Sequence, residues 1–135
     1  STSMQVIQGD TYNLLHAADL AIVASGTATL ETALLERPMV IVYRMAPLTY
    51  ALARLFVRVP YIGMPNLIAG RCVVPELIQG QVTAPNIAAA ARQLLTNTHT
   101  YSVAQEGLRE VRKRLGEPGA AKRAAGLIAQ MLEGR

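Results

Sequence analysis

Ser25, Gly26, Thr27 and Glu31 are the residues whose types and spacing best suit chemistry in this sequence. Gly26 lets the backbone approach a bulky anion, and the hydroxyls of Ser25 and Thr27 are hydrogen-bond donors. If a helix begins near Thr27, its free amides and positive dipole end favour a phosphate group. Glu31 then lies one turn along the same helical face, where its carboxylate can accept hydrogen bonds from the vicinal hydroxyls of a ribose. Together these residues indicate nucleotide binding.

An ordinary helix start explains the same four residues. Small polar residues begin many helices that bind no ligand, and an acid in the first turns complements the helix dipole. Arg44 also has two explanations, because an arginine just past a strand either pairs with a diphosphate or lies in solvent. The residues by themselves leave both interpretations open.

The elements around this group predict an α/β fold with a parallel sheet. Apolar runs at residues 20–24 and 39–43 are typical of strands buried on both faces, and residues 6–7 predict a further short strand. Helical spacing at residues 10–18 and 27–36 alternates with these runs, as in a βαβ repeat with right-handed crossovers. In such a sheet, ligands bind beyond the carboxyl ends of the strands. Ser25 and Arg44 both follow predicted strands and should therefore share one edge.

The second half of the sequence predicts mainly helices. Residues 61–71 indicate a short strand that runs into an ordered loop, and helices are expected at 75–79, 83–95, 102–115 and, after a break at 116–119, on to Leu132. Three strands make an incomplete sheet, because open doubly wound sheets usually have about five or six. We therefore expect a segment upstream of Ser1, and we expect the open sheet edge to be covered either by self-association or by contacts from the missing segments.

Residues 47–59 predict a helix that starts at its proline and carries Leu48, Ala51, Leu52, Leu55 and Phe56, with Arg54 and Arg58 as polar interruptions. We expect this helix to belong to the core.

Composition and charge exclude several classes of function. Of the 135 residues, 51% are hydrophobic and 16% charged, which indicates a folded domain. The single cysteine, Cys72, excludes an internal disulfide and fits a reducing compartment, and the sequence has no signal peptide or membrane-spanning run. The formal charge of +4 comes largely from residue 101 onward, where there are seven basic and four acidic residues. Among them, residues at helical spacing are Arg109, Arg112, Lys113 and Arg114 with Glu106 and Glu110. This pattern is typical of a solvated helix face, so we expect no nucleic-acid partner.

Neither histidine has a partner at a useful spacing, so we expect no metal site, no cofactor and no acid–base role for His16 or His99. Glu76 follows a proline and is interpreted as an acid at a helix start.

Three motifs in this order and spacing resemble the lipid-A-disaccharide synthase family. They are residues 24–31, residues 37–40 with Tyr43-Arg44-Met45, and residues 65–71 with the sequence Pro-Asn-Leu-Ile-Ala-Gly-Arg. The likeness runs over nearly the whole chain but covers only the C-terminal part of that family.

The resemblance implies the C-terminal, donor-binding half of an inverting glycosyltransferase with the two-Rossmann GT-B architecture. The implied reaction joins UDP-2,3-diacylglucosamine to 2,3-diacylglucosamine 1-phosphate at the cytoplasmic face of the inner membrane, without a metal. The implied substrate-binding residues are Ser25, Gly26, Thr27, Glu31, Arg44, Asn66, Gly70 and Arg71. The catalytic base and the N-terminal acceptor domain lie outside this chain, so we expect the fragment alone to be inactive.

The resemblance also suggests how the chain is divided. We expect residues 1–100 to form a partial Rossmann-like domain that binds the UDP-sugar, and residues 101–135 a helical tail that packs on, or swaps with, the rest of the enzyme. Two alternatives are another UDP-sugar enzyme similar to UDP-N-acetylglucosamine 2-epimerase, and a non-catalytic nucleotide-binding or interaction module.

Overall fold

A parallel three-stranded sheet forms the centre of the fold. The structure is a computed structural model that describes residues 2–56, 60–116, 126, 128–130 and 132–133. The strands are β1 (Ala21–Ala24), β2 (Met39–Tyr43) and β3 (Glu76–Ile78), in the order β1-β2-β3. Both pairings are parallel. The predicted α/β class with a Rossmann-like sheet is confirmed.

The helices are α1 (Thr11–Ala17), α2 (Thr27–Leu34), α3 (Pro47–Phe56), α4 (Met64–Ala69), α5 (Ala84–Thr96) and α6 (Thr98–Leu115), with a short 3₁₀ turn η1 (Gln79–Gln81) after β3. Hydroxyl and amide side chains fix two of these starts. Thr83 accepts a hydrogen bond from the amide of Asn86 at α5, and Asn97 accepts one from the amide of Thr100 at α6. The cap at Asn97 explains why α6 begins four residues before the predicted start at residue 102.

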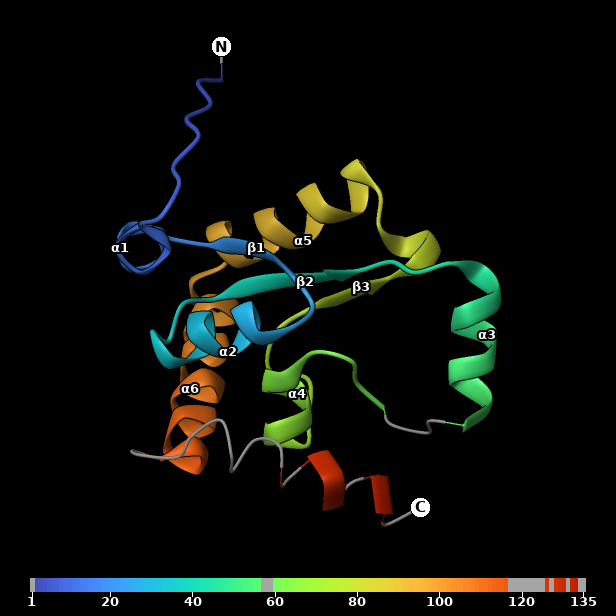
Figure 1. Cartoon of the computed structure of the whole chain (residues 1–135). Coiled ribbons are helices and arrows are strands. Elements are labelled where there is room, and N and C mark those ends of the chain that lie inside the picture. The colour runs from blue at the N-terminus through green and yellow to red at the C-terminus, as the bar shows by residue number, and fades with distance from the viewer. Residues whose placement is uncertain (1, 57–59, 117–125, 127, 131, 134–135) are drawn as a thin grey trace.

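The sheet lies between two helical layers (Figure 1). Val23 and Ile41 point to one face, where they pack with α2, α4 and α6 through residues such as Leu108. Val40 points to the other face, where it packs with Leu94 of α5. Successive β2 residues thus point to opposite layers, as the pleat of a strand requires. Because α6 supplies Leu108 and other buried residues, a boundary at residue 100 would fall inside a helix of the core.

β1 is less buried than its sequence predicts. Val23 is its one buried residue, while Ile22 is 55% exposed on the side of the sheet that α5 covers. The amides of Ala21 and Ser25 point toward β2, at Pro38 and Val42. By alternation, the amide of Ile22 points to the open side of β1. The prediction of burial on both faces holds for β2 and is wrong for β1, because β1 is an edge strand of the described sheet.

Three further predictions are wrong. Val6 and Ile7 form no strand; both are exposed in a segment of irregular backbone. Residues 61–71 contain helix α4 in place of a strand and loop, and residues 75–79 contain strand β3 in place of a helix. The expected break at 116–119 and most of the last helix lie outside the described residues, as do residues 57–59 of the helix expected at 47–59.

Candidate functional site

The carboxyl ends of the three strands gather the residues that the sequence singled out. β1 ends at Ala24 and continues into Ser25-Gly26, while β2 ends at Tyr43 and continues into Arg44. The amide of Ser25 donates to the carbonyl of Val42 at 3.0 Å, which ties the start of the first loop to the neighbouring strand. The predicted meeting of Ser25 and Arg44 at one edge of the sheet therefore has a structural basis.

Gly26 begins α2 with a backbone that only glycine adopts readily, at φ 147° and ψ −162°. Its carbonyl accepts hydrogen bonds from the amide of Thr29 at 3.1 Å and from the Thr29 hydroxyl at 2.6 Å. Thr29 is fully buried, so this double contact fixes the first turn. No described side chain caps the helix, so its first amides keep their capacity for an external acceptor.

Glu31 lies on the exposed side of α2. Thr27 and Glu31 are both exposed, whereas Thr29, Thr32 and Ala33 are buried, so the helix presents the first pair to solvent. The predicted spacing of one helical turn between Thr27 and Glu31 is therefore realised in a helix with the predicted start.

Gln79 is a residue of this edge that the sequence analysis missed. Its side chain accepts a hydrogen bond from the amide of Met45 at 2.7 Å and donates one to the carbonyl of Met45 at 3.0 Å. Gln79 itself has a positive φ of 55° at the end of β3. The pair fixes the backbone just after Arg44, whose own side chain is exposed. No local sequence signal indicates it, because the two residues are 34 positions apart.

Asn66 is fully buried, and its side chain makes four hydrogen bonds within the chain. Its amide group donates to the carbonyl of Val74 at 2.8 Å and to Glu76 Oε1 at 3.0 Å. Its carbonyl oxygen accepts from the amides of Val73 and Val74 at 2.7 and 3.1 Å. These four bonds use its full capacity. Asn66 therefore shapes the segment between α4 and β3 from inside.

Glu76 lies in β3, whereas the sequence analysis predicted a helix start at this residue. Its carboxylate accepts hydrogen bonds from the amides of Ile62 at 3.0 Å and Gly63 at 2.7 Å, just before α4. An added Cβ on Gly63 would overlap Ile41 Cδ1 and Glu76 Oε1, so any larger residue would have to displace these side chains. Glu76 thus joins the amino end of α4 to the sheet.

Gly70 and Arg71 lie at the other end of α4. Gly70 ends the helix with a left-handed backbone at φ 71°. The Arg71 guanidinium pairs with Glu110 of α6 at 2.7 Å, and this hydrogen bond lowers the pKa of the Glu110 carboxyl. Gly70 and Arg71 are exposed, and Glu110 is half-buried. The structure therefore gives Arg71 a partner within the chain, while Ser25, Gly26, Thr27 and Arg44 stand at the carboxyl edge.

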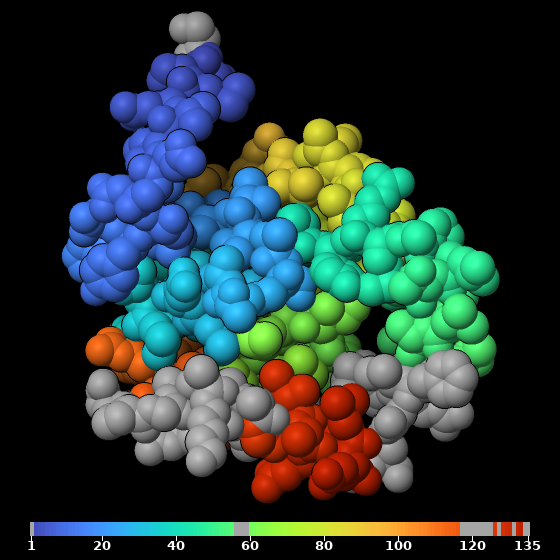
Figure 2. All heavy atoms as spheres, viewed as in Figure 1, coloured from blue at the N-terminus to red at the C-terminus, as the bar shows by residue number. Residues whose placement is uncertain are grey.

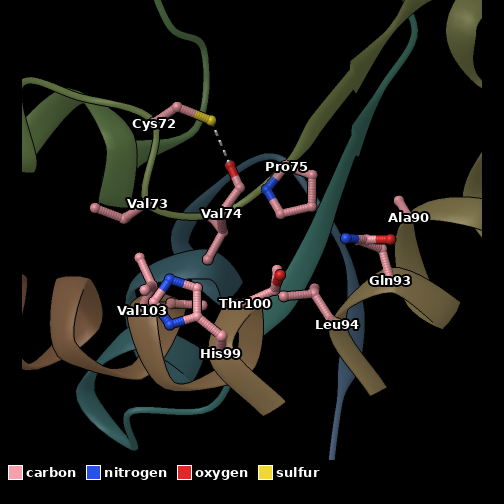
Figure 3. A pocket seen from close by; sticks show the side chains of 11 residues that line it. Cys72, Val73, Val74, Pro75, Ala90, Gln93, Leu94, His99, Thr100 and Val103 are labelled. Atoms are coloured by element: carbon pink, nitrogen blue, oxygen red, sulfur yellow. Dashed lines mark hydrogen bonds between the residues drawn. The ribbon is translucent and has the colours of Figure 1, made fainter. Parts of the chain in front are cut away.

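An apolar cavity of about 380 Å³ lies elsewhere, beside the amino end of β3. Side chains of residues 72–75 face those of α5 and α6 across it (Figure 3). The cavity is lined by Val74, Pro75, Leu94 and Val103, among others, and by none of the eight predicted donor-site residues. Its walls offer little to a diphosphate, so the carboxyl edge remains the better candidate for a nucleotide site.

A sequence model of the family described as lipid-A-disaccharide synthetase matches residues 1–131. The chain is 42% identical to a lipid-A-disaccharide synthase of Syntrophus aciditrophicus over 130 residues, which cover 96% of this chain and 34% of that protein. It is 46% identical to the synthase of Acidobacterium capsulatum over 131 residues, covering 96% and 33%. The chain thus spans about a third of the length of these curated relatives.

The parallel sheet, with its loops gathered at the carboxyl edge, is that of a Rossmann-like α/β protein, and the matched relatives are named as lipid-A-disaccharide synthases. The chain belongs to the lipid-A-disaccharide synthase family, as the three motifs of the sequence predict. Among the described residues, no helix combines the length and the apolar character that crossing a bilayer requires.

Proposed function

We propose that this chain binds the nucleotide of a UDP-sugar donor at the carboxyl edge of its sheet. The observation that carries the proposal is the start of α2, where the first amides have no side-chain cap and Glu31 stands exposed one turn along. The amides and hydroxyls at Ser25 and Thr27 would hold the diphosphate, and Glu31 would accept hydrogen bonds from the ribose. Arg44 would add a positive charge at the same edge.

The residues around α4 would contribute to the site less directly than those at the carboxyl edge. Asn66 has no free hydrogen-bonding capacity, so it would act by holding the segment that Gly70 and Arg71 begin. Arg71 would reach a diphosphate only by giving up its ion pair with Glu110, which is solvent-exposed and therefore weak.

The proposed reaction is the transfer of 2,3-diacylglucosamine to the 6-hydroxyl of 2,3-diacylglucosamine 1-phosphate with inversion. The bond from the anomeric carbon to the UDP oxygen breaks, the acceptor oxygen bonds to that carbon, and the hydroxyl proton passes to a base. We assign no residue of this chain as that base. The part of the site built here would position the leaving group, and the acylated substrates would place the enzyme at the cytoplasmic face of a membrane.

Calorimetric titration of UDP tests the proposal. We expect UDP to bind and Glu31→Gln to weaken it about tenfold, because hydrogen bonds to a charged group contribute about 1.5–3 kcal/mol. Pyrophosphate, which lacks the ribose, should bind the two proteins equally. Glu106→Gln, a change of an exposed acid on α6, is the matched control. Absence of UDP binding, or an affinity unchanged by Glu31→Gln, would refute the site.

A further inference from the structure

Helix α3 gives little support to the segment that links it to β2. Leu48, Leu52 and Leu55 are 74%, 48% and 69% exposed, and none of residues 47–55 is buried. The expectation that this helix belongs to the core is therefore wrong. Figure 1 shows α3 apart from the helices that cover the sheet, and Figure 2 shows its residues at the outer rim of the molecule. Residues 44–46, which connect β2 to α3, therefore depend on other contacts for their position.

The Arg44 side chain does not fix this segment either. Arg44 is exposed, and its guanidinium has no ion pair or hydrogen bond to any residue that the structure describes. The pairing of β2 with β3 ends one residue earlier, at Tyr43 and Ile78. The position of the guanidinium therefore depends on the backbone on either side of Arg44.

Gln79 holds this backbone. Its side chain accepts a hydrogen bond from the Met45 amide at 2.7 Å and donates one to the Met45 carbonyl at 3.0 Å. The backbone of Gln79 is left-handed, at φ 55°, which is uncommon for a residue other than glycine or asparagine. Such a conformation persists only where the surrounding contacts maintain it, and strained residues of this kind cluster at functional sites.

Contacts from α5 hold the turn η1, from which the Gln79 side chain reaches. The Gln81 side chain accepts a hydrogen bond from the Ile78 amide at 3.1 Å, and the Gln81 carbonyl accepts one from the Asn86 side chain at 3.0 Å. Asn86 lies in the first turn of α5. A series of hydrogen bonds therefore connects α5 through η1 to Met45.

We propose that Gln79 is a positioning residue of the donor site, which holds the backbone at Arg44 so that the guanidinium meets the diphosphate of the nucleotide. The inference rests on the proposed function, because it takes Arg44 as a ligand of the diphosphate. A long side chain loses conformational freedom when it binds, and a backbone that is already fixed reduces this loss. Gln79 would thus raise the affinity for the donor without a contact to it.

A double-mutant cycle, measured by calorimetric titration of UDP, tests the proposal. Arg44→Ala alone should weaken UDP binding about tenfold, because the charged hydrogen bonds to the diphosphate are lost. Gln79→Met keeps the length of the side chain and removes both bonds to the backbone. It should weaken UDP binding about fivefold in the parent chain, but by less than about twofold in the Arg44→Ala background. Pyrophosphate should show the same pattern.

Two further variants separate positioning from a loss of stability. Gln79→Met leaves the backbone groups of Met45 without their partner and lowers the urea midpoint. Gln79→Asn suits the left-handed backbone better, but its amide is one methylene too short to reach Met45. It should therefore stay folded and still weaken UDP binding. Gln93→Met makes the same exchange at an exposed position of α5 and should leave the UDP affinity unchanged.

The outcomes distinguish this inference from the proposed function. If UDP binds and responds to Glu31→Gln but not to the Gln79 variants, the positioning role alone is refuted. An equal loss in both Arg44 backgrounds would refute it too, since Gln79 would then act on the donor directly or on the whole fold. An unchanged affinity in Arg44→Ala has the same consequence. Absence of UDP binding by the parent chain would overturn both proposals.

Discussion

Gln79 and Met45 are joined by two hydrogen bonds, one in each direction, at 2.7 and 3.0 Å. The side chain of Gln79 thereby bonds to the backbone of Met45 as a neighbouring strand would, just beyond the last paired residues, Tyr43 and Ile78. Because Met45 follows Arg44, this contact extends the order of the sheet to the backbone of a candidate site residue. It requires both a donor and an acceptor, which only an amide side chain supplies at this length.

Gln79→Glu should therefore destabilise the chain although it preserves size and backbone. The carboxylate still accepts from the amide of Met45 but faces the Met45 carbonyl without a proton to donate, a loss of about 1–2 kcal/mol. Urea unfolding measures the change. Gln93→Glu, at an exposed position on α5, should stay within about 0.5 kcal/mol. Equal stability of the two variants would contradict this reading of the contact.

Gly26→Ala should cost about 1–3 kcal/mol, because alanine is strained at φ 147°. An added Cβ meets no atom within 4 Å, so the cost would come from the backbone alone. Gly80→Ala is the matched control: its surroundings are equally open and its φ is not positive. Urea unfolding of both variants, with UDP titration of each, checks the prediction, which fails if the two substitutions have the same effect.

Asn66→Asp should destabilise the chain by about 3 kcal/mol or more. The change keeps the shape but replaces two N–H donors with an oxygen that faces the Val74 carbonyl and Glu76, inside a buried site. Asn13→Asp also removes an amide that donates to a carboxylate, that of Asp10, but at an exposed position. Thermal unfolding should therefore separate the two variants clearly, and similar midpoints would show that the Asn66 network contributes little.

Long apolar runs and caps predicted the parts of the fold that depend on local sequence. β2, α2 and α5 occur where the sequence places them, because a buried strand of five apolar residues and a helix capped by Thr83 carry their own signals. The start of the candidate site was predictable for the same reason, since Ser25 and Gly26 directly follow a strand.

The missed elements depend on distant partners. β3 is three residues long and becomes a strand through β2, where the Ile41 amide donates to Pro75. α4 contains a proline and an asparagine, and its start is held by Glu76, which is distant in sequence. Val6 and Ile7 have strand-forming side chains but no described strand beside them. Strand and helix propensities alone could not predict these three segments.

The pKa of the Cys72 thiol makes the stability of the chain depend on pH. Cys72 is an exposed residue, but partial burial of its thiol, followed by the charge of Glu76, raises its pKa above the ordinary value of 9.0. The folded state therefore holds this proton more tightly, so the contribution to stability is complete below the unfolded pKa and is lost as pH rises through the folded pKa. Alkylation by iodoacetamide should accelerate at a higher pH in the native chain than in urea. A native midpoint at or below the denatured one would contradict the prediction.

Because β2 lies between β1 and β3, we expect the loop after β2 and the loop after β1 to open at different rates. Amides of β2 bond to neighbours on both sides and should exchange with deuterium only when the sheet comes apart, whereas β1 is bound on one side among the described strands. Arg44 thus follows the slowest-opening strand, and Ser25 follows one that frays earlier. A nucleotide held by both loops would therefore slow deuterium uptake mainly at the amides of Ser25 and Gly26, which follow the edge strand β1.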